Sequence, residues 1–221
     1  LNGQAAPVLD VQTRTRFNEA NDSHYYLVPG VIVTIMTMIG ALLTSLVMAR
    51  EYERGTLESL FVTPVGSGEI LTAKAATNFL LGMVSLAISM IFAAFVFDIP
   101  IRGSLILLLA VSALFLIVAL GLGLVISTAT KNQFLACQFA IMGTFMPALM
   151  LSGFLYDILN MPPAVRAITY IIPARYYVTL LQTLFLAGDI PSVIIPCCIT
   201  LGVFAVVLMG IARLKAPKSL E

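Results

Sequence analysis

Five long runs of apolar residues dominate the pattern of the chain. They cover residues 26–49, 75–97, 104–130, 134–155 and 191–212, and none contains Asp, Glu, Lys, Arg or His. An α-helix rises about 1.5 Å per residue and the hydrocarbon core of a bilayer is about 30 Å thick, so each run is long enough to cross. The pattern therefore predicts an all-α membrane protein with five transmembrane helices.

A further apolar stretch, residues 156–189, is interrupted by Pro162, Pro163 and Pro173. Its longest uninterrupted piece, residues 174–186, would extend only about 20 Å as a helix, which is too short to span. We expect short helices there that re-enter the outer leaflet. Irregular backbone at that depth must lie against protein or a wet cavity. Two interpretations stay open: the stretch lines an exit path, or it is a cap that anchors the last span.

Composition supports the membrane assignment. Of the 221 residues 60% are hydrophobic and only 10% are charged, whereas a soluble domain carries about 25% charged residues. The net charge is +1, so the chain has no basic field that would attract nucleic acid. We therefore expect the lipid bilayer as a partner and no nucleic acid.

Flanking basic residues predict the orientation, because Lys and Arg are retained on the cytoplasmic side of short loops. A cytoplasmic C-terminus places seven basic residues inside, namely Arg50, Arg54, Lys74, Lys131, Arg213, Lys215 and Lys218. Five lie outside, namely Arg14, Arg16, Arg102, Arg166 and Arg175. We expect an extracytoplasmic N-terminus and a cytoplasmic C-terminus.

The same topology divides the chain into three parts. Residues 1–24 are polar and turn-rich, as expected for the C-terminal remnant of an extracytoplasmic domain. Residues 25–215 form the transmembrane domain, and residues 216–221 form a cytoplasmic tail whose last two residues could derive from cloning.

Chemistry-bearing residues are scarce within the apolar runs. Ion-driven pumps usually carry a carboxylate or His relay inside the membrane, and these runs have neither. No GxxxxGK[ST] loop is present to hold a nucleotide. The single His24 and the three cysteines, Cys137, Cys197 and Cys198, give no catalytic triad and no metal-ligand spacing. The sequence therefore predicts neither a catalytic nor a metal site, and any transport would need energy from another chain.

The polar connection between the first two runs is amphipathic. Gly55 can end the preceding helix, and Pro64 stops whatever follows. Between them Leu57, Leu60 and Phe61 share one helical face at the i, i+3, i+4 spacing. Taken alone, this pattern favours an ordinary interfacial helix.

The order Arg-Glu-x-Glu-x-Gly-Thr-Leu-Glu-x-Leu-x-Val-Thr-Pro-Val at residues 50–65 closely resembles the signature of type-2 ATP-binding-cassette (ABC-2) transporter permeases. In that family the segment is the coupling helix, which docks on a cytosolic ATPase. Residues 151–154, 161–163, 173–178 and 186–188 resemble the family's region between its last two spans. The resemblance implies ATPase-coupling roles for Glu51, Glu53, Arg54, Gly55, Thr56, Leu57, Glu58, Leu60 and Phe61.

The resemblance also implies an assembly. The family pattern has six spans, and the subgroup linked to multidrug efflux has a large external domain after the first span, so this chain would hold spans two to six. Expected partners are a cytosolic ATP-binding-cassette ATPase and a second permease subunit, with room for a periplasmic adaptor. ATP and Mg would bind the ATPase and no cofactor would bind this chain, which would be a non-enzymatic exporter subunit in a bacterial inner membrane.

Polar and proline residues in or beside the spans are candidates for a translocation path. They are Thr37, Thr44, Asn78, Ser152, Pro173, Tyr176 and Tyr177. For the hydroxyl and amide residues within the spans, helix packing is the more usual role. The leading interpretation is export of a lipophilic or drug-like substrate. Alternatives are an ATP-independent channel, a structural subunit of an envelope complex and, last, an intramembrane enzyme.

Overall fold

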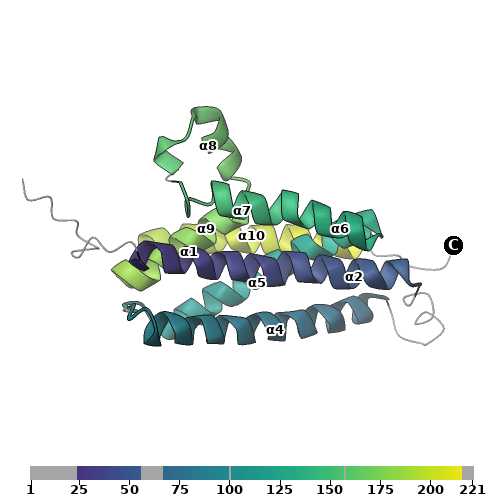
Figure 1. Ribbon diagram of the computed structural model, residues 1–221, viewed down its shortest axis with the longest axis horizontal. Helices are drawn as coiled ribbons and strands as arrows, with labels where there is room; N and C mark the ends of the chain where they lie inside the picture. The colour runs from purple at the N-terminus through teal and green to yellow at the C-terminus, as the bar shows by residue number, and fades with distance from the viewer. Residues whose placement is uncertain (1–23, 56–66, 100, 157, 216–221) are drawn as a thin grey trace, which may run out of the picture.

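The computed structural model describes residues 24–55, 67–99, 101–156 and 158–215. All regular secondary structure in these residues is helical, and the long helices lie roughly side by side in one bundle (Figure 1). The prediction of an all-α protein is confirmed.

Five helices in the described part of the chain are long and apolar enough to cross a membrane, as predicted. They are Leu27–Glu53, Thr72–Phe95, Leu105–Thr130, Gln133–Leu151 and Pro191–Leu214. The second, third and fifth belong to α4 (Ser67–Phe95), α5 (Leu105–Thr130) and α10 (Pro191–Lys215). The first and the fourth each contain a π-helical segment. The first consists of α1 (His24–Thr37), η1 (Met38–Leu43) and α2 (Thr44–Glu53), and the fourth of α6 (Gln133–Ala140), η2 (Ile141–Phe145) and α7 (Met146–Leu151).

Several helix ends differ from the apolar runs, among them the start of α4, which begins at Ser67 instead of residue 75. The first helix continues past residue 49 to Glu53, because the polar residues that follow the apolar run still form a helical turn. The fourth ends at Leu151 instead of residue 155, since Gly153 adopts a φ of 90° that leaves the right-handed helical region. Apolar composition therefore predicts the presence of a spanning helix better than it predicts where that helix ends.

Helix α5 is the centre of the bundle. It packs against α2, η1, α4, α9 and α10, and its side chains Phe115 and Leu116 are buried. Two glycines allow a close backbone approach: a Cβ on Gly123 would lie 2.6 Å from the carbonyl oxygen of Ala41, and one on Gly40 would lie 2.4 Å from the Cβ of Ala119. The first span is therefore packed directly on α5.

Short helices connect the fourth and the last spans: η3 (Ile158–Asn160), α8 (Pro163–Thr169), α9 (Pro173–Gln182) and η4 (Thr183–Ala187). Helix α8 projects from the side of the bundle next to α7, whereas α9 lies within the bundle (Figure 1). The prediction of short helices that do not span is confirmed. Tyr177 holds α9 in place, because its hydroxyl donates to Ser112 Oγ at 2.8 Å and its ring stacks on Phe115 at a centroid distance of 4.1 Å.

We predict that Gly123→Ala destabilises the bundle by about 1–3 kcal/mol, because the added methyl group must displace the backbone of the first span. Gly210→Ala on α10 is the matched control, since nothing lies within 4 Å of a Cβ there. The midpoint of thermal unfolding in detergent measures both. Equal midpoints for the two variants would show that the close contact at Gly123 is unimportant.

Candidate functional site

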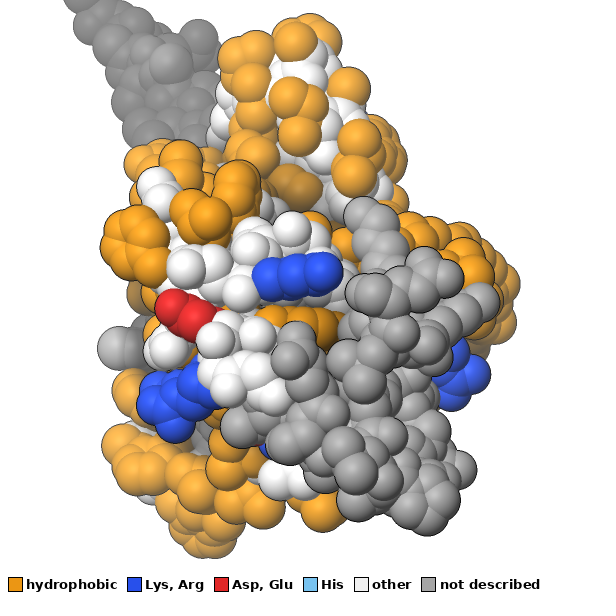
Figure 2. Space-filling model, turned by 90° about the vertical axis from the view of Figure 1, so that its right-hand side faces the viewer, with side chains coloured by type: hydrophobic (Ala, Val, Ile, Leu, Met, Phe, Trp, Pro, Cys, Tyr) orange, Lys and Arg blue, Asp and Glu red, His pale blue; other side chains and the backbone are white. Residues whose placement is uncertain are grey.

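The end of the bundle where α2, α5 and α10 finish and α4 and α6 begin carries most of the described charge, and we call it the Arg54 end. Its described basic residues are Arg50, Arg54, Lys74, Lys131, Arg213 and Lys215. Figure 2 views this end and shows blue and red side chains among white polar atoms, with hydrophobic side chains at the flanks. Gly55 has a φ of 66° directly after α2, which confirms that the first helix is broken there.

Helix α2 is bonded to α4 at two levels. Lys74 Nζ lies 2.6 Å from Glu51 Oε1, and both side chains are only partly exposed. Deeper in the bundle, Asn78 Nδ2 donates to Thr44 Oγ1 at 3.1 Å, and both residues are buried. Glu51, predicted to contact an ATPase, thus has a partner within the chain, and Thr44 and Asn78 join two spans.

The same helix is bonded to α6 on another side. Glu53 Oε2 accepts a hydrogen bond from the backbone N–H of Gln133 at 3.0 Å, at the first residue of α6. Within the bundle, the buried Ser45 hydroxyl donates to the carbonyl oxygen of Ala136 at 3.3 Å. The sequence does not predict Lys74 or Gln133 as partners, since helix pairing across 23 and 80 residues leaves no local signal.

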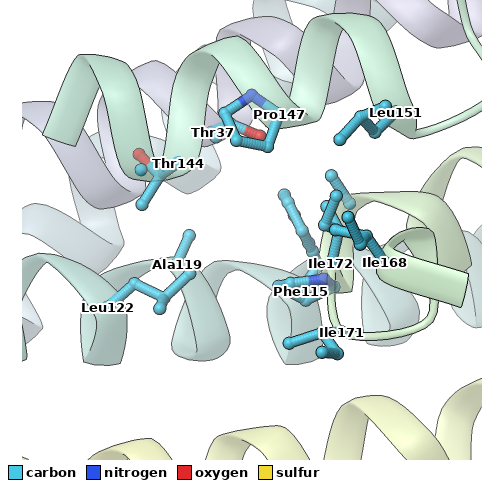
Figure 3. Close-up of a pocket in the computed structure, with 13 residues that line it drawn as sticks. Thr37, Phe115, Ala119, Leu122, Thr144, Pro147, Leu151, Ile168, Ile171 and Ile172 are labelled. Atoms are coloured by element: carbon cyan, nitrogen blue, oxygen red, sulfur yellow. The ribbon is translucent and has the colours of Figure 1, made fainter. Parts of the chain in front are cut away.

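An apolar cavity of about 340 Å³ lies between α5 and the fourth span. Figure 3 shows Ala119 and Leu122 on α5 facing Thr144 and Pro147 on the opposite helix. The walls consist of Thr37, Phe115, Ala119, Leu122, Gly143, Thr144, Pro147, Leu151, Ile168, Ile171, Ile172, Pro173 and Ala174.

The two threonines contribute little polarity to this cavity. Thr37 Oγ1 donates to the carbonyl oxygen of Val33 at 2.8 Å, and Thr144 Oγ1 donates to that of Ala140 at 2.5 Å. Each hydroxyl is therefore satisfied by its own helix, and no charged residue is among those that line the cavity. The surface suits an apolar or weakly polar molecule.

Only some of the translocation candidates meet at the cavity. Thr37 and Pro173 line it, and Ser152 follows the wall residue Leu151 with a buried hydroxyl that has no partner among the described residues. Tyr177 lies behind the wall residue Phe115, and Tyr176 donates its hydroxyl to the carbonyl oxygen of Tyr170 at 2.9 Å. Thr44 and Asn78 lie at the α2–α4 contact instead.

The π-helical segments of the first and fourth spans adjoin the cavity. Segments η1 and η2 contact one another; the wall residue Thr37 directly precedes η1, and the wall residues Gly143 and Thr144 lie within η2. A π-helical segment inside an α-helix is rare and frequently occurs at functional sites. The sequence gives no sign of either segment.

Comparison with known proteins identifies the architecture. Residues 2–214 match the family described as ABC-2 family transporter protein. The chain belongs to the ABC-2 transporter family. The resemblance carried by residues 50–65 is thereby confirmed at the level of the family.

Curated relatives of this permease are transport proteins. The chain is 48% identical over 221 residues to the probable multidrug ABC transporter permease YbhS of Escherichia coli K12, covering all of the chain and 59% of the relative. It is 31% identical over 180 residues to the permease YbhR, covering 80% of the chain and 48% of the relative. It is 28% identical over 215 residues to the inner membrane transport permease YhhJ, covering 97% of the chain and 57% of the relative. The chain thus spans just under three fifths of the length of YbhS.

The predicted coupling segment is only partly described. Glu51 and Glu53 lie in the last turns of α2, and Arg54 and Gly55 follow directly. Thr56, Leu57, Glu58, Leu60 and Phe61 lie outside the described residues. The coupling helix therefore stays a prediction of the sequence, as do the external-domain subgroup and the domain limits at residues 24 and 215.

We predict that Glu51→Lys lowers the thermal unfolding midpoint of the permease in detergent, because it places two ammonium groups at the Glu51–Lys74 contact. The double swap E51K/K74E should regain most of the loss. The single variant should lower the free energy of unfolding by about 1 kcal/mol or less, because the pair is partly exposed.

The matched control is E51K/K131E. It has the same net charge as the double swap, but the new carboxylate lies at the C-cap of α5 rather than on α4. If both double variants recover stability equally, the Glu51–Lys74 pair has no specific role.

Proposed function

We propose that this chain is the membrane-spanning part of a permease subunit that couples ATP hydrolysis by a separate cytosolic ATPase to outward transport of a lipophilic or drug-like substrate. One observation carries the proposal. The first span lines the apolar cavity with Thr37 and continues as helix to Glu53, past the start of the coupling signature at Arg50. A push on the segment after Gly55 therefore reaches the cavity wall along one helix.

The substrate class follows from the cavity. Its lining is apolar and its volume of about 340 Å³ falls within the range of small-molecule sites. Two relatives are named as probable multidrug permeases, which agrees with a lipophilic cargo. A charged molecule would leave its charge unpaired against these walls, at a cost of several kcal/mol.

The proposed assembly contains two permease subunits, equal or different, and an ATPase that binds ATP and Mg. The Arg54 end would face the cytoplasm of a bacterial cell, because its six described basic residues agree with the positive-inside rule. A periplasmic adaptor could join the opposite end. Exposed apolar residues on α4, α6 and α10, among them Leu80, Phe139 and Val203, would face lipid or the second subunit.

The test uses the full-length permease co-expressed with its ATPase and reconstituted into vesicles. We expect both chains to co-purify and the vesicles to move a neutral lipophilic dye, Nile red, against its gradient only with ATP and Mg. Dye movement that ignores ATP would support a channel, and a failure to retain any nucleotide-hydrolysing partner would contradict the proposal.

We predict that Gly143→Leu reduces ATP-driven dye transport by about tenfold, the effect of removing roughly 1.4 kcal/mol of binding. Gly143 lines the cavity and has nothing within 4 Å of a Cβ, so the larger side chain enters the cavity without a clash. Gly210→Leu on α10 is the control, because it is equally free of contacts but does not line the cavity. Equal transport by both variants would exclude this cavity from the path.

A further inference from the structure

We propose that Ser45 and Glu53 are positioning residues that make α6 move together with α2. The push of the ATPase on the coupling segment, which we call the coupling stroke, would then open the cavity by bending the first and fourth spans at their π-helical segments η1 and η2. This inference rests on the proposed function. It adds that the coupling stroke also moves the fourth span. The sequence links the coupling segment only to the first and second spans.

Two hydrogen bonds, which we call the α2–α6 tie, join the two helices. One involves the first turn of α2 and the other its last residue. Ser45 lies in the first turn of α2 and bonds Ala136, while Glu53 ends α2 and bonds Gln133. The first bond is buried. The second places a carboxylate on the N-terminus of α6, where the helix dipole favours negative charge. The two helices also pack directly against each other.

The place of bending is set by backbone geometry. Helix α2 begins where η1 ends, and α6 ends where η2 begins, so each partner of the tie has a π-helical segment at its inner end. Sharp changes of helix direction occur at such segments. Because η1 and η2 are in contact, the two bends lie at one level of the bundle.

Beyond this level the helices are held by other partners. Helices α1 and α7 both pack on α9, which is fixed to α5 through Tyr177, Ser112 and Phe115. In α7, Pro147 has no backbone N–H to donate to the helix. A rotation of the α2–α6 pair therefore changes the cavity at Gly143 and Thr144, within η2, while the α9 side stays in place.

The test measures access to the cavity from α5, which is outside the moving pair. Leu122 on α5 lines the cavity opposite Thr144 (Figure 3), so Leu122→Cys is introduced into the full-length permease with its native cysteines replaced by serine. The permease is reconstituted with its ATPase, and the rate of reaction with N-ethylmaleimide is measured without nucleotide and after trapping with ATP, Mg and vanadate. We expect trapping to change this rate by about fivefold or more, within the range of ordinary conformational couplings.

In the same background, S45A/E53A should reduce the change to less than about twofold. Glu53→Gln should retain the change, because its amide oxygen can still accept the hydrogen bond from Gln133. Rescue by this conservative variant distinguishes transmission from a general need for the acidic residue.

The matched control is Asn132→Ala. The Asn132 side chain accepts from the N–H of Leu135 at 3.1 Å and caps the same end of α6, but it makes no link to α2. The control should respond to ATP like the parent. The inference is overturned if Asn132→Ala loses the response as S45A/E53A does, if S45A/E53A keeps the response, or if trapping leaves the parent's rate unchanged.

These failures differ from failure of the proposed function. If the ATPase does not bind the permease, or ATP does not drive dye transport, the proposed function is wrong and the tie has nothing to transmit. If transport is ATP-driven but access to Leu122 does not depend on Ser45 and Glu53, the function stands and only the transmission route is wrong.

Discussion

The close approach of the first span to α5 determines the rest of the bundle. Between helices in lipid, apolar burial gives no driving force, so association depends on close packing and on hydrogen bonds. Gly123 and Gly40 supply that packing, since a side chain at either position would overlap atoms of the neighbouring span. With α1, η1 and α2 set on α5, the partners of α2 on either side, α4 and α6, come within hydrogen-bond reach at Thr44 and Ser45.

The sequence predicts the spans well because their signal is local and strong. About 20 uncharged apolar residues have few structures open to them other than a spanning helix. The break at Gly55 and the short helices after Pro163 and Pro173 also follow from local chemistry. The family resemblance rests on the polar connection at residues 50–65, of which only residues 50–55 are described, and on the stretch from residue 151 to residue 188.

The parts that the sequence does not predict depend on helix pairing. Glu51 and Glu53 look like surface charges for a partner protein, yet each is bonded to another helix of the same chain. Tyr177 looks like a path residue at a membrane interface, but its ring and hydroxyl are used against α5. The π-helical segments differ from α-helix only in the register of backbone hydrogen bonds, which side chains at 38–43 and 141–145 do not reveal.

The two ends of the bundle differ in how they can respond to force. At the end of the bundle near α9, hydrogen bonds of the backbone fix the loop before α5. The N–H of Gly103 donates to the carbonyl oxygen of Leu184 in η4 at 2.8 Å, and the side chain of Asp189 accepts from the N–H of Ser104 at 2.9 Å. At the Arg54 end, side chains of α2 make the links. Backbone bonds to α5 hold one wall of the cavity in a fixed frame, whereas side-chain links let the other wall move as a unit. A fixed wall beside a movable one would let the cavity of the proposed permease change volume while the backbone bonds of the fixed wall stay intact.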